Sequence, residues 1–167
     1  VLHLSCHGHP DYLALENGFG DMQALPVGDL RRFISAGGDS LDFVFVSACH
    51  SRSAGDAFLQ AGVPHVVCCK QDAKFRDEAA AEFARNFYRA LACNRTLKQA
   101  FNMAREAVRV SPVVKDSELE TDKYLLLPEK ADSDSYHDVK VLFGDHACDR
   151  HRDGTPHNPP RSIRTVP

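Results

Sequence analysis

The stretch LDFVFVSAC at residues 41–49 is an unbroken apolar run that ends in a cysteine. Such a run is typical of a central strand covered on both faces, as in a parallel sheet. A second run, VLHLSCHG at residues 1–8, has the same form and closes with His7 and Gly8. Helical patterns alternate with these strand patterns along the chain. The sequence therefore predicts an α/β sandwich with a mostly parallel central sheet flanked by helices.

The other elements are predicted from the spacing of apolar residues and from turn residues. The charged stretch from Lys115 to Lys123 is expected to be a surface loop. We expect a hairpin from Tyr12 to Leu25 around Asn17-Gly18, a helix from Val27 to Ile34, a helix capped by Ser53 and ending at Ala61, a strand from His65 to Cys69, a helix from Asp77 to Leu91, a helix that begins at a Thr96–Gln99 capping box, and short strands at Tyr124–Leu127 and Val139–Phe143.

Length and composition are those of one globular domain. The chain has 167 residues, of which 43% are hydrophobic and 26% charged, and a formal net charge of −3. This charge argues against nucleic acid as a main partner, and no apolar stretch reaches the roughly 20 residues of a membrane span. We expect a domain over residues 1–145 and a polar tail or linker over 146–167. Val1 lies within a strand pattern, which indicates a fragment.

The six cysteines do not form an evident disulfide framework. Cys68 and Cys69 are adjacent in a predicted strand, so their side chains point to opposite faces and are not expected to pair. We therefore expect a reduced, cytoplasmic protein.

His7 and Cys49 are the candidate reactive pair. Ligand sites in open α/β sheets form outside the carboxyl ends of the strands, and both residues stand at such ends. A thiol with an ordinary pKa of about 8.5 is mostly protonated at neutral pH, and a nearby imidazole helps to generate the thiolate. Gly8 allows close backbone approach, so its N–H and that of Cys49 are candidate oxyanion donors.

A longer pattern of sequence segments supports the interpretation of His7 and Cys49 as a reactive pair. It consists of VLHLSCHG at 1–8, FVSAC at 45–49, AFLQAGVPHVV at 57–67, EFARNFYRAL at 82–91 and QAFNMAR at 99–105. Together these segments resemble, in register from about residue 1 to 110, the CHAT domain. This is a caspase-like module often found beside tetratricopeptide repeats or nucleotide-binding modules.

The resemblance implies a caspase-like three-layer sandwich whose first strand would precede Val1. It also implies a cysteine endopeptidase with His7 and Cys49 as a dyad that works through a thioester acyl-enzyme. The backbone N–H groups of Gly8 and Cys49 would bind the oxyanion, with no cofactor and no metal. Attached tetratricopeptide-repeat or NTPase modules, or a partner, would regulate the domain, whose substrate would be a protein or peptide.

Two departures from the family pattern bear on substrate preference. The chain has no tryptophan, and CKQD stands at residues 69–72, where the family commonly has a Trp soon after the third strand. His50 follows Cys49 where an acidic residue is frequent. Asp72 is the candidate for a pocket carboxylate that pairs with a basic substrate side chain. The alternative role for Asp72 is to form a turn or to cap a helix.

Other functions remain open from the sequence. Cys49 and His7 fit equally a buried thiol and an end-of-strand histidine. The principal alternative function is a catalytically silent caspase-like module that serves as a protein-interaction platform. A weaker one is a flavodoxin-like binder of a small ligand at the same sheet edge.

A zinc site is the competing chemical interpretation. His3, Cys6, His7 and His9 form one dense group, and His146, Cys148 and His151 form another. Neither group has the spacing of a structural zinc site. We therefore predict no metal, and we expect His3 to be a core histidine with a backbone partner.

Overall fold

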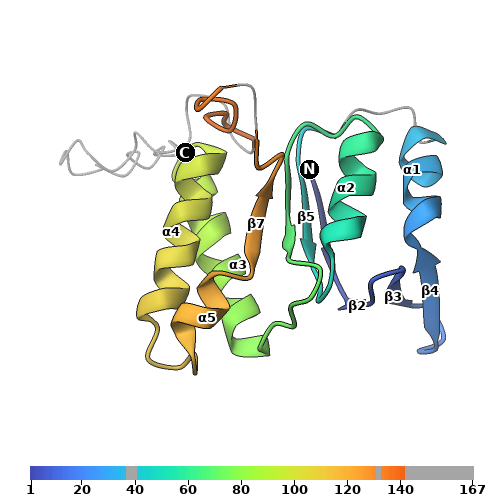
Figure 1. The fold of residues 1–167 in the computed structure, drawn as a ribbon, viewed down its shortest axis with the longest axis horizontal. Helices are drawn as coiled ribbons and strands as arrows, with labels where there is room; N and C mark the ends of the chain where they lie inside the picture. Colours follow the sequence, from blue (N-terminus) through green and yellow to red (C-terminus); the bar gives the residue numbers. More distant parts are fainter. Residues whose placement is uncertain (37–40, 131–132, 142–167) are drawn as a thin grey trace, which may run out of the picture.

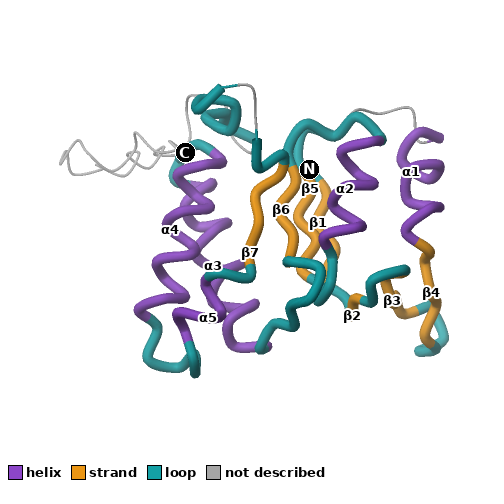
Figure 2. The backbone as a smooth tube through the Cα atoms, viewed as in Figure 1, coloured by secondary structure: helices purple, strands orange, loops and turns teal. Residues whose placement is uncertain are grey.

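A four-stranded sheet lies at the centre of the fold, in the strand order β1-β5-β6-β7 (Figures 1 and 2). β1 (Leu2–Ser5), β5 (Val44–Ser47) and β6 (Val66–Cys69) are parallel, and β7 (Tyr124–Leu127) pairs antiparallel with β6. The mostly parallel sheet predicted from the sequence is confirmed.

The structure is a computed structural model and describes residues 1–36, 41–130 and 133–141. The expected tail over 146–167 lies outside these residues. None of the helices in the described ranges is long and apolar enough to traverse a bilayer.

Helices cover both faces of the sheet. In Figure 1, α1 (Val27–Ala36) and α2 (Arg52–Gln60) lie on one side, and α3 (Asp77–Ala92) and α4 (Leu97–Val110) lie on the other. This arrangement is the expected α/β sandwich, and it is consistent with a caspase-like fold.

The apolar run that predicted the central strand divides its side chains between the two layers. Phe43 and Phe45 pack into the core beneath α3 and α4, whereas Val44 and Val46 pack into the core beneath α1 and α2. All four are at most 1% exposed. A strand whose side chains alternate between two cores must be apolar throughout, which explains the sequence of residues 43–46.

A second, antiparallel sheet lies beside the first and consists of β2 (His7–Gly8), β3 (Tyr12–Glu16) and β4 (Met22–Pro26). The predicted hairpin is β3–β4. Its turn is held by the Asn17 side-chain oxygen, which accepts hydrogen bonds from two backbone amides of the turn. β2 was not expected as a separate strand. It forms because the chain leaves β1 at Cys6 and pairs with β3 instead.

The capping box predicted at the start of α4 is confirmed. The Thr96 hydroxyl accepts from the Gln99 amide, and the Gln99 side chain accepts from the Thr96 amide. These two bonds satisfy N–H groups that have no partner inside the helix.

The predicted start of α2 was wrong. The helix begins at Arg52 and Ser51 occupies its N-cap position, so Ser53 is not the cap. The Ser53 hydroxyl donates instead to the carbonyl of Pro10, 2.6 Å away. Ser53 thereby ties α2 to the segment that follows β2.

The surface loop predicted for residues 115–123 was also wrong. It contains a short helix, α5 (Ser117–Thr121), whose last two residues, Glu120 and Thr121, are buried. The charged composition of this stretch does not reveal that one of its carboxylates, that of Glu120, is buried.

The strand predicted at Val139–Phe143 is not formed over the part that is described, which ends at residue 141. Instead, the Val139 carbonyl accepts a hydrogen bond from the Leu97 amide at the start of α4. The side chains of Val139 and Val141 pack at the edge of the core under α3 and α4.

Candidate active site

The parallel pairing of β1 with β5 brings His7 and Cys49 to one edge of the sheet. Ser5 is paired with Ser47, and each candidate residue lies two positions beyond its strand's last pair. Both residues line the same surface cleft, which has a volume of about 520 Å³. His7 is exposed and Cys49 is partly exposed, so both side chains are accessible from solvent.

Gly8 packs directly against the backbone of Cys49. A β carbon at Gly8 would stand 1.8 Å from the Cys49 carbonyl oxygen and 3.0 Å from its amide nitrogen. No side chain fits in this space, which explains why a glycine stands at this position. The close approach also brings together the two backbone segments that the sequence analysis named as oxyanion donors.

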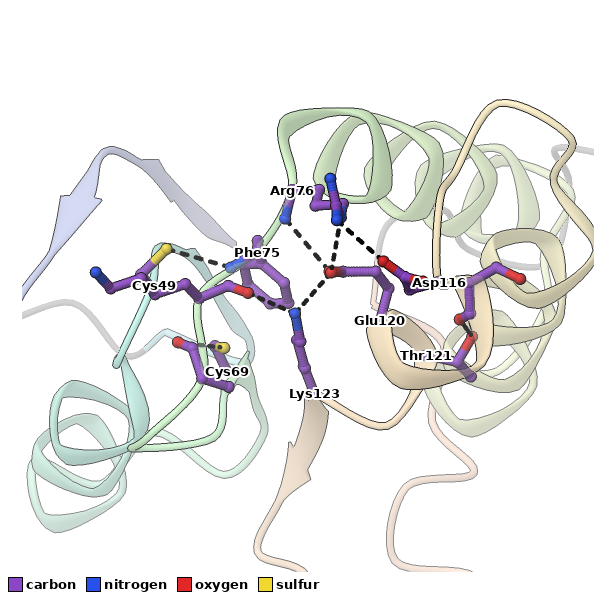
Figure 3. Close-up of polar contacts among 11 residues, drawn as sticks. Cys49, Cys69, Phe75, Arg76, Asp116, Glu120, Thr121 and Lys123 are labelled. Carbon is purple, nitrogen blue, oxygen red and sulfur yellow. Dashed lines mark hydrogen bonds and ion pairs between the residues drawn. The ribbon is translucent and has the colours of Figure 1, made fainter.

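The thiol of Cys49 has a specific polar partner. The backbone N–H of Phe75 donates to the Cys49 Sγ, with a nitrogen–sulfur distance of 3.3 Å (Figure 3). Phe75 also lines the cleft and belongs to the loop between β6 and α3. The sulfur of Cys49 is therefore the acceptor of a backbone hydrogen bond at the edge of the cleft. The sequence analysis missed this contact because a backbone donor leaves no signature in residue type.

His50 ties the loop that carries Cys49 to the loop after β6. Its backbone N–H donates to the carbonyl of Ala73 at 3.0 Å, and its Nδ1 donates to the carbonyl of Gln71 at 2.7 Å. His50 has a φ of 52°, so the chain turns sharply just after Cys49. The histidine that departs from the family pattern therefore has a structural role in this chain.

The thiols of three other cysteines are held in less reactive environments. Burial raises the pKa of Cys6, Cys68 and Cys69, and the pKa of Cys69 reaches about 12, with the neighbouring Cys49 as a further cause. The cysteines of the described residues are all free thiols, so Cys68 and Cys69 do not pair with each other. These raised pKa values suppress the competing thiolates.

Asp72, the candidate pocket carboxylate, lies on an exposed turn and is not among the residues that line the cleft. The cleft instead contains two other carboxylates, Glu16 at the end of β3 and Asp77 at the start of α3. The sequence analysis missed them because their positions depend on how the hairpin and α3 fold back towards Cys49.

The dense group of histidines and Cys6 does not converge. His3 is exposed, and its ring stacks on Phe45 with centroids 4.7 Å apart, on the face that α3 covers. Cys6 packs with the core on the opposite face. The expectation that His3 is a core residue was wrong, because β1 carries it at the rim of that core.

Within residues 1–36, 41–130 and 133–141, no three His, Cys, Asp or Glu side chains are grouped to hold a metal. His146, Cys148 and His151 lie outside these ranges.

The comparisons with known proteins agree with this geometry at the level of the family. The family model described as "CHAT domain" matches residues 1–152, which is most of the chain. No curated protein matches the sequence.

Proposed function

Because the chain belongs to the CHAT domain family, which is caspase-like, we propose that it is a cysteine endopeptidase with Cys49 as nucleophile and His7 as proton carrier. One observation supports this proposal most strongly. The β1–β5 register brings an imidazole and a thiol from distant parts of the sequence to the lining of one cleft. Attached domains or a partner regulate access to the site.

In the proposed reaction His7 takes the proton of the Cys49 thiol, and the thiolate sulfur attacks the scissile carbonyl carbon and forms a carbon–sulfur bond. The carbonyl π electrons move to oxygen, and the N–H groups of Gly8 and Cys49 stabilise the resulting oxyanion. When the oxyanion collapses, the carbon–nitrogen bond breaks and His7 gives a proton to the leaving amine. Water then attacks the thioester, His7 removes a proton from it, and the Cys49 thiolate leaves. The contact between Gly8 and the Cys49 backbone supports this assignment.

The charge of the cleft favours a substrate with a basic side chain near the scissile bond. Glu16 and Asp77 line the cleft, and among the residues that the structure describes no lysine or arginine lines it. Neither carboxylate forms an ion pair within the described part of the chain. A lysine or arginine of a bound peptide can therefore pair with them. These two residues replace Asp72 as the proposed source of basic specificity.

The test combines thiol reactivity with peptide hydrolysis on the same variants. Limiting iodoacetamide at pH 7, followed by peptide mass mapping, ranks the alkylation rate of every cysteine in wild type, His7→Ala and His9→Ala. His9 is the matched control because it is close in sequence but does not line the cleft. We expect Cys49 to react faster than Cys93, and we expect only His7→Ala to slow it, by about tenfold or more.

Hydrolysis is measured with a mixture of peptides in which the central residue is basic, acidic or neutral. We expect cleavage after basic residues, its loss in Cys49→Ala and its retention in Cys93→Ala. If Cys49 of the wild-type chain reacts no faster than Cys93, His7→Ala does not slow it, and no peptide is cut, the chain is a silent interaction module instead.

A further inference from the structure

Glu120, at the end of α5, is a buried carboxylate with a defined set of partners (Figure 3). The residue is 2% exposed. Its carboxylate accepts from the Lys123 ammonium at 2.6 Å and from the backbone N–H of Arg76 at 3.3 Å, and it pairs with the Arg76 guanidinium at 3.7 Å. A buried charge is costly unless it is paired and hydrogen-bonded in this way. These contacts therefore hold Lys123 and Arg76 in place.

Those partners lie on both sides of Phe75 in the sequence. Lys123 also donates from Nζ to the carbonyl of Lys74, 2.7 Å away, which anchors the residue before Phe75. The Arg76 amide anchors the residue after it, through Glu120. The Phe75 ring itself stacks on Tyr124, with centroids 4.4 Å apart. The backbone of Phe75 is thus held from both neighbours and by its own side chain.

This held backbone is the one that contacts the nucleophile. The Phe75 N–H donates to the Cys49 Sγ at 3.3 Å, and a hydrogen bond to sulfur strengthens when the sulfur is a thiolate. A shift of the amide by a fraction of an ångström weakens the bond steeply. The contact therefore depends on the position of the segment from Lys74 to Arg76.

We propose that Glu120 is a positioning residue: through Lys123 and Arg76 it holds the Phe75 amide against the Cys49 sulfur, so that α5 controls the fraction of reactive thiolate. The inference rests on the proposed function only in naming Cys49 as the nucleophile. The hydrogen bonds that carry it do not depend on which reaction follows.

The sign of one measurement separates positioning from a direct charge effect. The negative charge of Glu120 repels a nearby thiolate and so disfavours its formation. This repulsion is one of the causes that raise the pKa of Cys69. Neutralising Glu120 would then make the Cys49 thiolate form more readily. If Glu120 acts by positioning, neutralising it loosens the Phe75 amide and makes the thiolate form less readily. The two effects have opposite signs.

The experiment is the pH profile of Cys49 alkylation by iodoacetamide in the full chain, for wild type, Glu120→Gln and Glu118→Gln. Glu118 is the matched control because it removes the same charge from the same helix at an exposed position. We expect Glu120→Gln to move the midpoint of the profile up by about one pH unit, so that Cys49 reacts about tenfold more slowly at pH 7. Glu118→Gln and the rate at Cys93 are expected to match wild type. A midpoint that falls or does not move overturns the proposal.

A second pair of variants covers the case in which Glu120→Gln fails to fold. Lys123→Met removes the bond to the Lys74 carbonyl, whereas Lys123→Arg keeps a cation with N–H donors at that position. We expect slow alkylation of Cys49 in Lys123→Met and recovery in Lys123→Arg, with both folded by near-ultraviolet circular dichroism. Equal rates in both variants overturn the proposal. Because alkylation requires no peptidase activity, a chain that shows these shifts but cuts no peptide contradicts the proposed function alone.

Discussion

Substitution of Gly8 by alanine tests the geometry of the site most directly, because the consequence follows from backbone positions alone. The added β carbon would lie 1.8 Å from the Cys49 carbonyl oxygen, whereas real contacts of this kind essentially never fall below 3.0 Å. Both partners are backbone, so no flexible side chain yields. β2 and the Cys49 segment must therefore move apart by about 1.2 Å, the difference between these two distances.

This displacement has two measurable costs. Overpacking of a well-packed site lowers the free energy of unfolding by about 1–3 kcal/mol, and a displacement of about 1 Å in a catalytic site lowers the rate about 100-fold. We expect Gly8→Ala to show both, in urea unfolding followed by circular dichroism and in kcat/KM for a cleaved peptide. Gly18→Ala is the control, because a β carbon at Gly18 meets nothing within 4 Å. If Gly8→Ala unfolds at the same urea concentration as Gly18→Ala and cuts peptide as fast, β2 does not lie against Cys49 as described.

Three other predictions follow from separate parts of the structure. Burial and the adjacent His137, whose Nδ1 is 3.0 Å from that of His65, lower the pKa of His65 to about 4. His65 is therefore neutral in the folded chain but protonated in the unfolded chain between about pH 6.5 and 4. We expect the free energy of unfolding to fall by the order of 2 kcal/mol as the pH drops through this window, and urea titrations of His65→Gln should lose most of that dependence. For specificity, Asp77→Asn and Glu16→Gln should each lower kcat/KM for peptides with a central arginine severalfold, whereas Asp72→Asn should leave it unchanged; equal effects of all three would contradict the assignment of the cleft. Thr96→Ala removes the helix cap and the hydroxyl bond to Asp138, and should lower the free energy of unfolding, measured by urea titration, by about 1 kcal/mol; a smaller loss would mean that water replaces the cap.

The sequence predicted the sheet well because the apolar periodicity of its strands is set by burial on two faces. Val44 and Phe45 are fully or almost fully buried in opposite cores, and no polar residue could replace either without cost. The position of His7 and Cys49 at one edge of the sheet was also predictable, since the end of a parallel strand is visible in the sequence as the end of its apolar run. Whether His7 and Cys49 act together stays a prediction.

What the sequence did not predict depends on contacts between distant segments. Glu120 lies among eight other residues of a charged stretch, and nothing in that stretch distinguishes a buried carboxylate from exposed ones. Its burial follows from the packing of α5 against α4 and α3, and Arg76 and Lys123 supply the compensating charge. Likewise, Asp77 lines the cleft only because α3 begins beside Cys49, whereas Asp72, closer in sequence to the strand end, turns away.

The contrast among the cysteines is consistent with the proposed role of Cys49 at the sheet edge. Cys68 and Cys69 lie within β6 and are fully buried, one on each face of the sheet, and burial raises the pKa of both thiols. Cys49 lies just beyond the end of β5 and is partly exposed. Its sulfur also has an amide donor, the N–H of Phe75, which is free to point at it because it belongs to a loop, whereas the amides of a strand interior are used in the ladder. The position of Cys49 two residues past the last β1–β5 pair thus gives its thiol a backbone donor together with an opening to solvent, which the buried thiols of β6 lack.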